Sequence, residues 1–250
     1  MIEQFGILPI IIIWLTITTA YIIFGITGFG TALVASPILA FFIPVNKIVP
    51  LLALLDCFAA ITNVLRDRLQ ADKAELKRLI PLMIIGSLVG ASILFYTRPD
   101  ILIPILGVFV ICYALYNLVG IKPQSTYSAK AVVPFGIIGG IFSALFGSGG
   151  FIYAIYLSGR IKDKNTIRVT QSTLIGLSTF TRIIIFLIAG IYLDTYFIGV
   201  VLLLIPSMLL GVFIGRHITL KLSKEQFLII INIVILLSGL SLLINYLIKI

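Results

Sequence analysis

Long apolar runs divide the chain, and short segments between them carry nearly all of its charge. A helix that crosses the roughly 30 Å hydrocarbon core of a bilayer needs about 20 apolar residues at about 1.5 Å each. Six predicted spans meet this requirement: residues 48–65, 79–96, 101–119, 168–190, 197–215 and 226–248. Only 11% of the residues are charged, against about a quarter in soluble domains. The pattern therefore predicts an all-α polytopic membrane protein in contact with lipid, and it excludes a soluble one.

The net charge of +9 would suit a nucleic-acid-binding protein, but the positions of the charges argue against one. Fourteen of the 18 basic residues lie in four loops between apolar runs, at residues 66–78, 120–130, 159–168 and 216–224. Loops rich in Lys and Arg stay on the cytoplasmic side of a membrane. We therefore expect these loops to be cytoplasmic and both chain termini to lie outside the cytoplasm.

Two segments, 7–43 and 131–158, fit this topology only if each enters and leaves the membrane on the same side. Each is interrupted by glycines, GITGFG at residues 25–30 and GSGG at residues 147–150. The apolar runs that follow, 30–43 and 150–158, are too short to span a bilayer. Within a membrane such a break is tolerated only where protein or a water-filled cavity surrounds it. Each segment is predicted to be a broken helical hairpin.

The two halves of the chain also match in sequence. The segment from Pro81 to Gly90 (PLMIIGSLVG) repeats as Pro206 to Gly215 (PSMLLGVFIG), and the two glycine breaks align with each other. The basic loop 66–78 corresponds to 190–196, which has no basic residue. Matched sequence with opposite charge bias predicts two inverted-topology repeats, residues 1–120 and 121–250, that form one transmembrane domain. Each repeat is a broken hairpin followed by three transmembrane helices, and interrupted segments at equivalent places indicate a transporter's binding site.

The breaks are the predicted substrate site. In this topology the N-termini of the two short helices point inward from opposite sides, and their unpaired N–H groups and positive dipole ends favour an anion. Nearby hydroxyl groups, Ser143 among them, would add hydrogen-bond donors. The alternative is that the glycines only let helices pack closely, which is the role expected of Gly86, Gly90, Gly211 and Gly215. The predicted substrate-binding residues at the breaks are Thr27, Gly28, Gly30, Thr31, Ser148, Gly149 and Gly150.

Two charged residues lie deep inside predicted spans at nearly the same depth, Arg182 and Asp56. Charges there are costly and face protein or water. Either the two form a buried ion pair that holds the repeats together, or Arg182 binds the substrate while Asp56 carries a proton or acts as a gate. Asn63, the counterpart of Arg182 in the repeat alignment, is a further candidate for coupling or gating. A polar stripe accompanies them: Thr62, Gln171, Ser172, Thr173, Ser178, Thr179 and Thr181.

The pattern Gly28-x-Gly30-Thr31-x5-Pro37, with a second glycine-rich break near mid-chain, resembles the sulfite exporter TauE/SafE family, also called toluene-sulfonate uptake permeases. The resemblance covers essentially the whole chain. It implies transport of sulfite, sulfonates or related sulfur-containing or carboxylate anions across a bacterial cytoplasmic membrane. The chain departs from the pattern at Thr31, where relatives often continue with glycine, and at Tyr156, which stands where Pro37 stands in the first repeat.

The sequence thus predicts a secondary anion transporter that works by alternating access, with a coupling ion such as H+. A passive anion channel and a membrane subunit of a larger complex remain alternatives, and residue types do not set the oligomeric state. An enzyme is not expected, because the chain has one His, two dispersed Cys and no acidic pair or HExxH motif. No cofactor and no metal site are expected.

Overall fold

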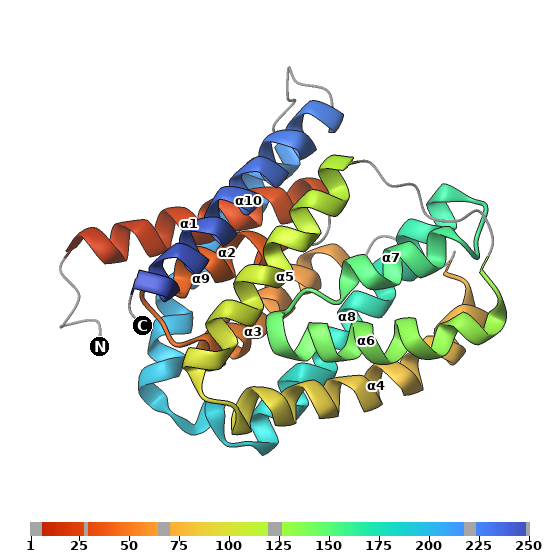
Figure 1. Cartoon of the computed structure of the whole chain (residues 1–250), viewed down its shortest axis with the longest axis horizontal. Helices are drawn as coiled ribbons and strands as arrows, with labels where there is room; N and C mark the ends of the chain where they lie inside the picture. The colour runs from red at the N-terminus through yellow and green to blue at the C-terminus, as the bar shows by residue number, and fades with distance from the viewer. Residues whose placement is uncertain (1–6, 28–29, 65–70, 120–126, 218–223, 249–250) are drawn as a thin grey trace. The chain divides into compact units, whose positions relative to one another are not determined.

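The computed structural model describes residues 7–27, 30–64, 71–119, 127–217 and 224–248 (Figure 1). This part of the chain is helical and contains no strand. Its long helices are α1 (Ile7–Thr27), α3 (Val45–Val64), α4 (Lys73–Tyr96), α5 (Pro99–Val119), α6 (Val132–Phe146), α8 (Lys164–Ile188), α9 (Thr195–His217) and α10 (Lys224–Ile248). The short ones are α2 (Thr31–Leu39), α7 (Gly150–Ser158) and the 3-10 turns η1 (Ala129–Ala131) and η2 (Ile191–Leu193). The predicted all-α fold class is confirmed.

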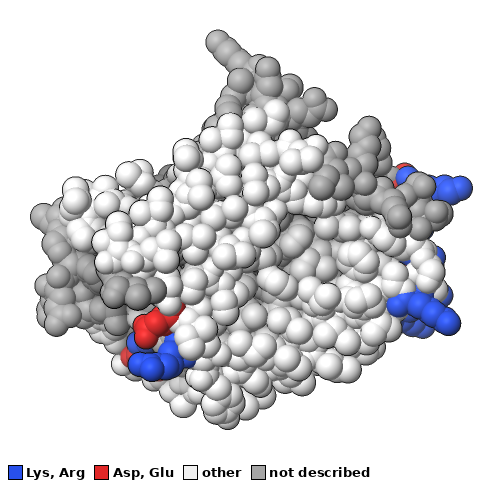
Figure 2. All heavy atoms as spheres, viewed as in Figure 1, with Lys and Arg blue, Asp and Glu red and all other residues white. Residues whose placement is uncertain are grey.

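Among the described residues, six helical segments are long and apolar enough to cross a membrane. Four of them lie in α4, α5, α8 and α9, which the sequence predicted as spans. The other two lie in α1 and in η1 with α6, the first arms of the predicted hairpins, so these arms have full spanning length. The predicted spans 48–65 and 226–248, in α3 and α10, include residues whose side chains the structure does not describe. Figure 2 shows charged atoms in only a few small groups on its visible described surface, as expected of a multi-pass membrane protein.

The helices form two compact units that differ from the two sequence repeats. Unit 1 comprises Met1–Ile48, Thr97–Ile121 and Leu204–Ile250, and unit 2 comprises Val49–Tyr96 and Lys122–Leu203. In unit 1, α1 packs on α2, and α10 packs on α5 and α2. In unit 2, α4 packs along α6, and α7 contacts both α6 and α8. Each unit therefore combines helices from both halves of the chain.

Each predicted hairpin has one long and one short helix. The short helices α2 and α7 have nine residues each, which at about 1.5 Å per residue is under half of the bilayer core. The first break is narrower than predicted, because α1 continues through Gly25 to Thr27. A Cβ atom on Gly25 would lie 3.0 Å from the Val212 carbonyl oxygen, so this glycine serves close packing against α9. The α2 helix ends at Leu39, so the predicted apolar run 30–43 extends beyond it.

The glycines expected to serve close helix packing do so in both units: Gly86 and Gly90 of α4 face α6, and Gly211 and Gly215 of α9 face α1. A Cβ on Gly86 would overlap the Ile137 carbonyl oxygen, and a Cβ on Gly211 would lie 2.5 Å from the Thr18 carbonyl oxygen. The separation in sequence between Thr18 and Ile137 is the same as that between Gly30 and Gly149, the aligned positions of the two glycine breaks. Equivalent glycines of the two halves therefore make equivalent backbone contacts, each within its own unit.

Candidate functional site

The second glycine break forms a tight turn between α6 and α7 in unit 2. Gly147 ends α6 in the left-handed region, with a φ of 69° that a side chain would disfavour. Its N–H group donates to the Ser143 carbonyl oxygen at 2.8 Å. The chain then passes through Ser148 and Gly149 into α7. The N–H groups of Ile152 and Tyr153 donate to the Gly149 carbonyl oxygen at 3.1 and 3.3 Å. The positive end of the α7 dipole lies at this turn.

Two buried hydroxyl groups belong to the turn and to the first turn of α7. Ser148 is 6% exposed and Tyr153 is fully buried. The hydroxyl group of Ser148 has no hydrogen-bond partner among the described residues, and that of Tyr153 makes no well-formed hydrogen bond there, although Ser178 lies nearby. A buried polar group without a partner costs about 1–3 kcal/mol. Ser148 in the turn and Tyr153 in the first turn of α7 therefore carry hydroxyl groups that a polar ligand could satisfy.

Polar side chains of α6 and α8 complete the surroundings of this turn. The hydroxyl groups of Ser143 and Ser178 are hydrogen-bonded to each other at 2.5 Å and join α6 to α8. The Gln171 amide nitrogen donates to the Gly150 carbonyl oxygen at 3.3 Å, which ties α8 to the start of α7. A Cβ atom on Gly149 would overlap the Gly139 carbonyl oxygen, so α7 begins in direct contact with α6. The N-terminus of α7 is thus held by a hydrogen bond from α8 and by close packing against α6.

The two charged residues predicted at matched depth lie together in unit 2. A guanidinium nitrogen of Arg182 on α8 is 3.7 Å from a carboxylate oxygen of Asp56 on α3, and their side chains are 2% and 10% exposed. The same nitrogen donates to the Thr179 hydroxyl oxygen at 3.0 Å. Arg182 also interacts electrostatically with the Tyr153 hydroxyl group. The buried charge pair and the Tyr153 hydroxyl group are therefore parts of one polar region inside unit 2.

The family model for the sulfite exporter TauE/SafE matches residues 13–242 of the chain. The chain belongs to the TauE/SafE sulfite exporter family. Members of this family are membrane transporters, so the polar region of unit 2 lies in a multi-pass protein of a transporter family. Neither the curated proteins nor the solved structures include a match to the chain.

The first break of this TauE/SafE protein belongs to unit 1. Gly30 precedes α2 with a φ of 96°, and Thr31, the first residue of α2, is 3% exposed. Gly28 lies outside the described residues, as do the side chains of Thr27 and Asn63. The convergence of both breaks on one substrate stays a prediction.

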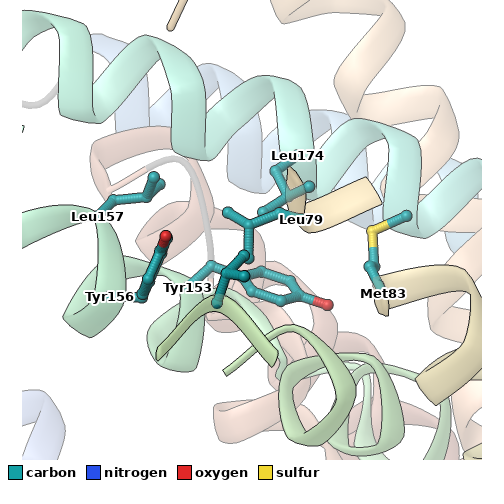
Figure 3. Packing of buried hydrophobic residues seen from close by; sticks show 7 residues of the cluster. Leu79, Met83, Tyr153, Tyr156, Leu157 and Leu174 are labelled. Carbon is teal, nitrogen blue, oxygen red and sulfur yellow. The ribbon is translucent and has the colours of Figure 1, made fainter. Parts of the chain in front are cut away.

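One residue of the unit 2 region, Tyr153, was not among the predicted site residues, and the predicted polar stripe of this TauE/SafE chain is only partly buried. Tyr153 lies in an apolar run, where a tyrosine is usually a core residue, and its ring packs with Leu79, Met83 and Leu174 (Figure 3). In the stripe, Ser178 and Thr179 are buried, whereas Ser172 is exposed. The hydroxyl groups of Thr173 and Thr181 donate to carbonyl oxygens of their own helix. In the described part of the chain, no group of three or more His, Cys, Asp or Glu residues could hold a metal ion.

Proposed function

We propose that the chain is a secondary transporter that moves a small anion across the bacterial cytoplasmic membrane by alternating access. Its proposed substrates are sulfite, an organosulfonate or a related sulfur-containing or carboxylate anion. The observation that carries this proposal is the turn before α7, where the positive end of a helix dipole lies beside the buried Ser148 hydroxyl group. That hydroxyl group has no hydrogen-bond partner among the described residues, and the buried Tyr153 hydroxyl group belongs to the first turn of α7. Family membership supports the same reading.

The chemistry of this turn suits an oxyanion. Several oxygen atoms of one small anion can accept hydrogen bonds from backbone N–H groups and from the hydroxyl groups of Ser148 and Tyr153. Arg182 would supply the full positive charge, since its guanidinium group presents several donors in a fork that matches an oxyanion. Without an anion, Asp56 at 3.7 Å balances that charge. We therefore assign substrate binding to Ser148, Gly149, Gly150 and Arg182 in unit 2.

The remaining roles follow from the predicted inverted repeats. Thr27, Gly28, Gly30 and Thr31 would form the equivalent substrate-binding turn of the first half, and Asp56 and Asn63 would couple transport to an ion such as H+ or act as gates. The equivalent glycine contacts of the two halves support the repeat. With the basic loops in the cytoplasm, both termini would lie outside. A passive anion channel or a subunit of a larger complex is the alternative.

A counterflow experiment separates these possibilities. Purified protein in proteoliposomes loaded with unlabelled sulfite is diluted into a trace of radiolabelled sulfite. A carrier accumulates label transiently above its external concentration, whereas a channel only equilibrates it. We expect accumulation by the wild type and by Gly176→Ala, because a Cβ atom on Gly176 meets nothing within 4 Å.

The matched variant Gly149→Val should fold but lose counterflow. Its Cβ atom would overlap the Gly139 carbonyl oxygen and lie 2.8 Å from the Ser143 Cβ atom, so the N-terminus of α7 must move. Equilibration without accumulation by the wild type would favour the channel. Normal counterflow by Gly149→Val would mean that the turn is a packing feature and does not bind the substrate.

A further inference from the structure

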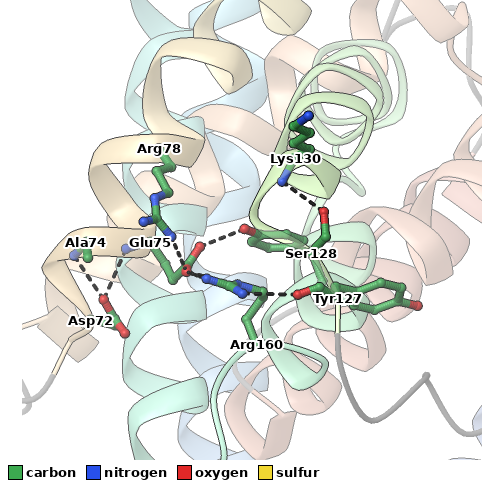
Figure 4. Close-up of polar contacts among 9 residues, drawn as sticks. Asp72, Ala74, Glu75, Arg78, Tyr127, Ser128, Lys130 and Arg160 are labelled. Atoms are coloured by element: carbon green, nitrogen blue, oxygen red, sulfur yellow. Dashed lines mark hydrogen bonds and ion pairs between the residues drawn. The ribbon is translucent and has the colours of Figure 1, made fainter.

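A second polar cluster lies at the opposite end of α7. Glu75, in the first turn of α4, is only 4% exposed. Its carboxylate accepts hydrogen bonds from Arg160 at 2.8 and 3.1 Å, from Arg78 at 2.9 Å and from the Tyr156 hydroxyl group at 2.7 Å (Figure 4). We call these four residues the Glu75 clamp. The clamp joins the start of α4 to the last turn of α7 and to the segment that follows it.

The partners of the clamp are themselves fixed in place. Arg160 also donates to the Tyr127 carbonyl oxygen at 3.0 Å, and the Tyr127 N–H group donates to the Gly159 carbonyl oxygen at 2.9 Å. Asp72 accepts the Glu75 N–H group at 3.0 Å and holds the first turn of α4. The Asp72 N–H group donates to the Thr170 hydroxyl oxygen of α8 at 2.8 Å. The hydrogen bonds through Asp72 therefore hold the start of α4, with the Glu75 carboxylate, in place against α8.

Charge neutralisation alone does not explain the clamp. The side chains of Arg78 and Arg160 are 45% and 24% exposed, so water can hydrate both without Glu75. A carboxylate that is 5% exposed gives up much more hydration than its partners do. What the burial achieves is geometric, because Tyr156 of α7, Arg160 of the segment after α7 and Arg78 of α4 all donate to one carboxylate. The hydrogen bond from Tyr156 fixes the last turn of α7 in particular.

The helix α7 connects the Glu75 clamp to the turn that precedes α7. Tyr156 and Tyr153 are three residues apart, so they lie on the same face of α7, and both rings belong to one cluster with Leu79 of α4 (Figure 3). A helix of nine residues is a short, stiff rod of about 13.5 Å. A displacement of its last turn along the axis moves its first turn by a similar amount. Ser148 and the N–H groups of the turn would move with it.

We propose that Glu75 is a positioning residue for the anion site. It holds the C-terminal end of α7 and thereby fixes the position of Tyr153, Ser148 and the N-terminus of α7. This inference rests on the proposed transport function. The position equivalent to Tyr156 in the first half of the chain is Pro37, so this hydroxyl group has no counterpart in α2.

The test compares Glu75→Gln and Tyr156→Phe with the wild type in sulfite transport. Tyr156→Phe removes one hydroxyl group and leaves both ion pairs, so it carries the test if Glu75→Gln does not fold. We expect both variants to raise KM on the order of tenfold, since a shift of about 1 Å at a binding site has large kinetic effects. The matched control is Asp100→Asn, whose carboxylate is 72% exposed and 4.0 Å from Arg98; its KM should equal that of the wild type.

A second readout does not depend on the substrate. Ser148→Cys is introduced after Cys57 and Cys112 are replaced by alanine, and the rate at which a small thiosulfonate reagent labels the new thiol is measured. Glu75→Gln and Tyr156→Phe should change this rate severalfold, and Asp100→Asn should not. An unchanged labelling rate in both clamp variants overturns the positioning role even if they melt at lower temperature. A wild type that transports no sulfite or sulfonate while the labelling rates change as expected would refute the proposed function and keep the positioning role.

Discussion

Breaking the ion pair between Asp56 and Arg182 should lower the stability of the protein by different amounts, depending on which of the two residues is replaced. A carboxyl group that loses its buried partner can take up a proton and become neutral, whereas a guanidinium group stays charged. Asp56→Asn therefore leaves a permanent charge on a side chain that is 2% exposed, inside a membrane helix. Arg182→Gln leaves the Asp56 carboxyl group, which can take up a proton and become neutral. We expect Asp56→Asn to be the more destabilising change.

The magnitude follows from the geometry of the pair. At a separation of 3.7 Å and an effective dielectric constant of about 20, the attraction between the two charges is about 4.5 kcal/mol. Removing one partner of a buried pair costs about 3–5 kcal/mol, because the other charge stays buried. For a chain of 250 residues this corresponds to a fall in Tm on the order of 10 °C. The hydrogen bond from Arg182 to Thr179 survives in Asp56→Asn and offsets only part of the loss.

The assay is a double-mutant cycle measured by thermal unfolding in detergent and by sulfite affinity. Asp56→Asn should lower Tm most, Arg182→Gln less, and the double variant should recover much of the stability. Asp100→Asn is the control, since an exposed pair contributes less than about 1 kcal/mol. Equal losses in the two single variants, or losses no larger than that of the control, would refute the reasoning. Unchanged sulfite affinity in Arg182→Gln would remove Arg182 from the substrate site.

Three further predictions concern the glycines and the topology. Gly30 has a φ of 96° with open space around it, so Gly30→Ala should lower stability by about 1–2 kcal/mol through backbone strain, and Gly30→Asn by less; equal Tm values would contradict this. Gly86→Ala should destabilise the protein because its Cβ atom would overlap the Ile137 carbonyl oxygen, whereas Gly176→Ala should stabilise it by about 0.5–1 kcal/mol, and thermal unfolding of both variants checks the contrast. In oriented vesicles, a cysteine replacing the exposed Lys73 should be labelled only from the cytoplasmic side and one replacing the exposed Thr195 only from outside; labelling of both from one side would overturn the inverted topology.

The fold class follows from sequence because the bilayer imposes few solutions on long apolar runs. The glycines of the Gly86 and Gly211 segments were also interpretable in advance, since only a missing Cβ atom allows two helix backbones to approach closely. Gly25 was not, because a glycine that packs inside a helix and a glycine that ends one look the same in sequence. The close contact with Val212 distinguishes them, and it joins residues far apart in the chain.

The candidate site was only partly predictable for the same reason. The matched depth of Asp56 and Arg182 could be counted along the chain, so their pairing was among the expected alternatives. Tyr153 could not be recognised, because a tyrosine in an apolar run is usually core and only the tertiary structure shows that its hydroxyl group lacks a well-formed hydrogen bond. Glu75 lies within the predicted basic loop 66–78. It is buried beside Arg160, an ion-pair partner that is distant in sequence.

The most direct test of the central claim is the position of the bound anion. A cryo-electron microscopy map of the protein in saturating sulfite should show density at the turn before α7. The density should lie about 2.6–3.2 Å from the hydroxyl oxygens of Ser148 and Tyr153, with Arg182 oriented toward it, and it should be absent without sulfite. Sulfite density elsewhere in the protein, with both hydroxyl groups hydrogen-bonded to protein or water, would contradict the account.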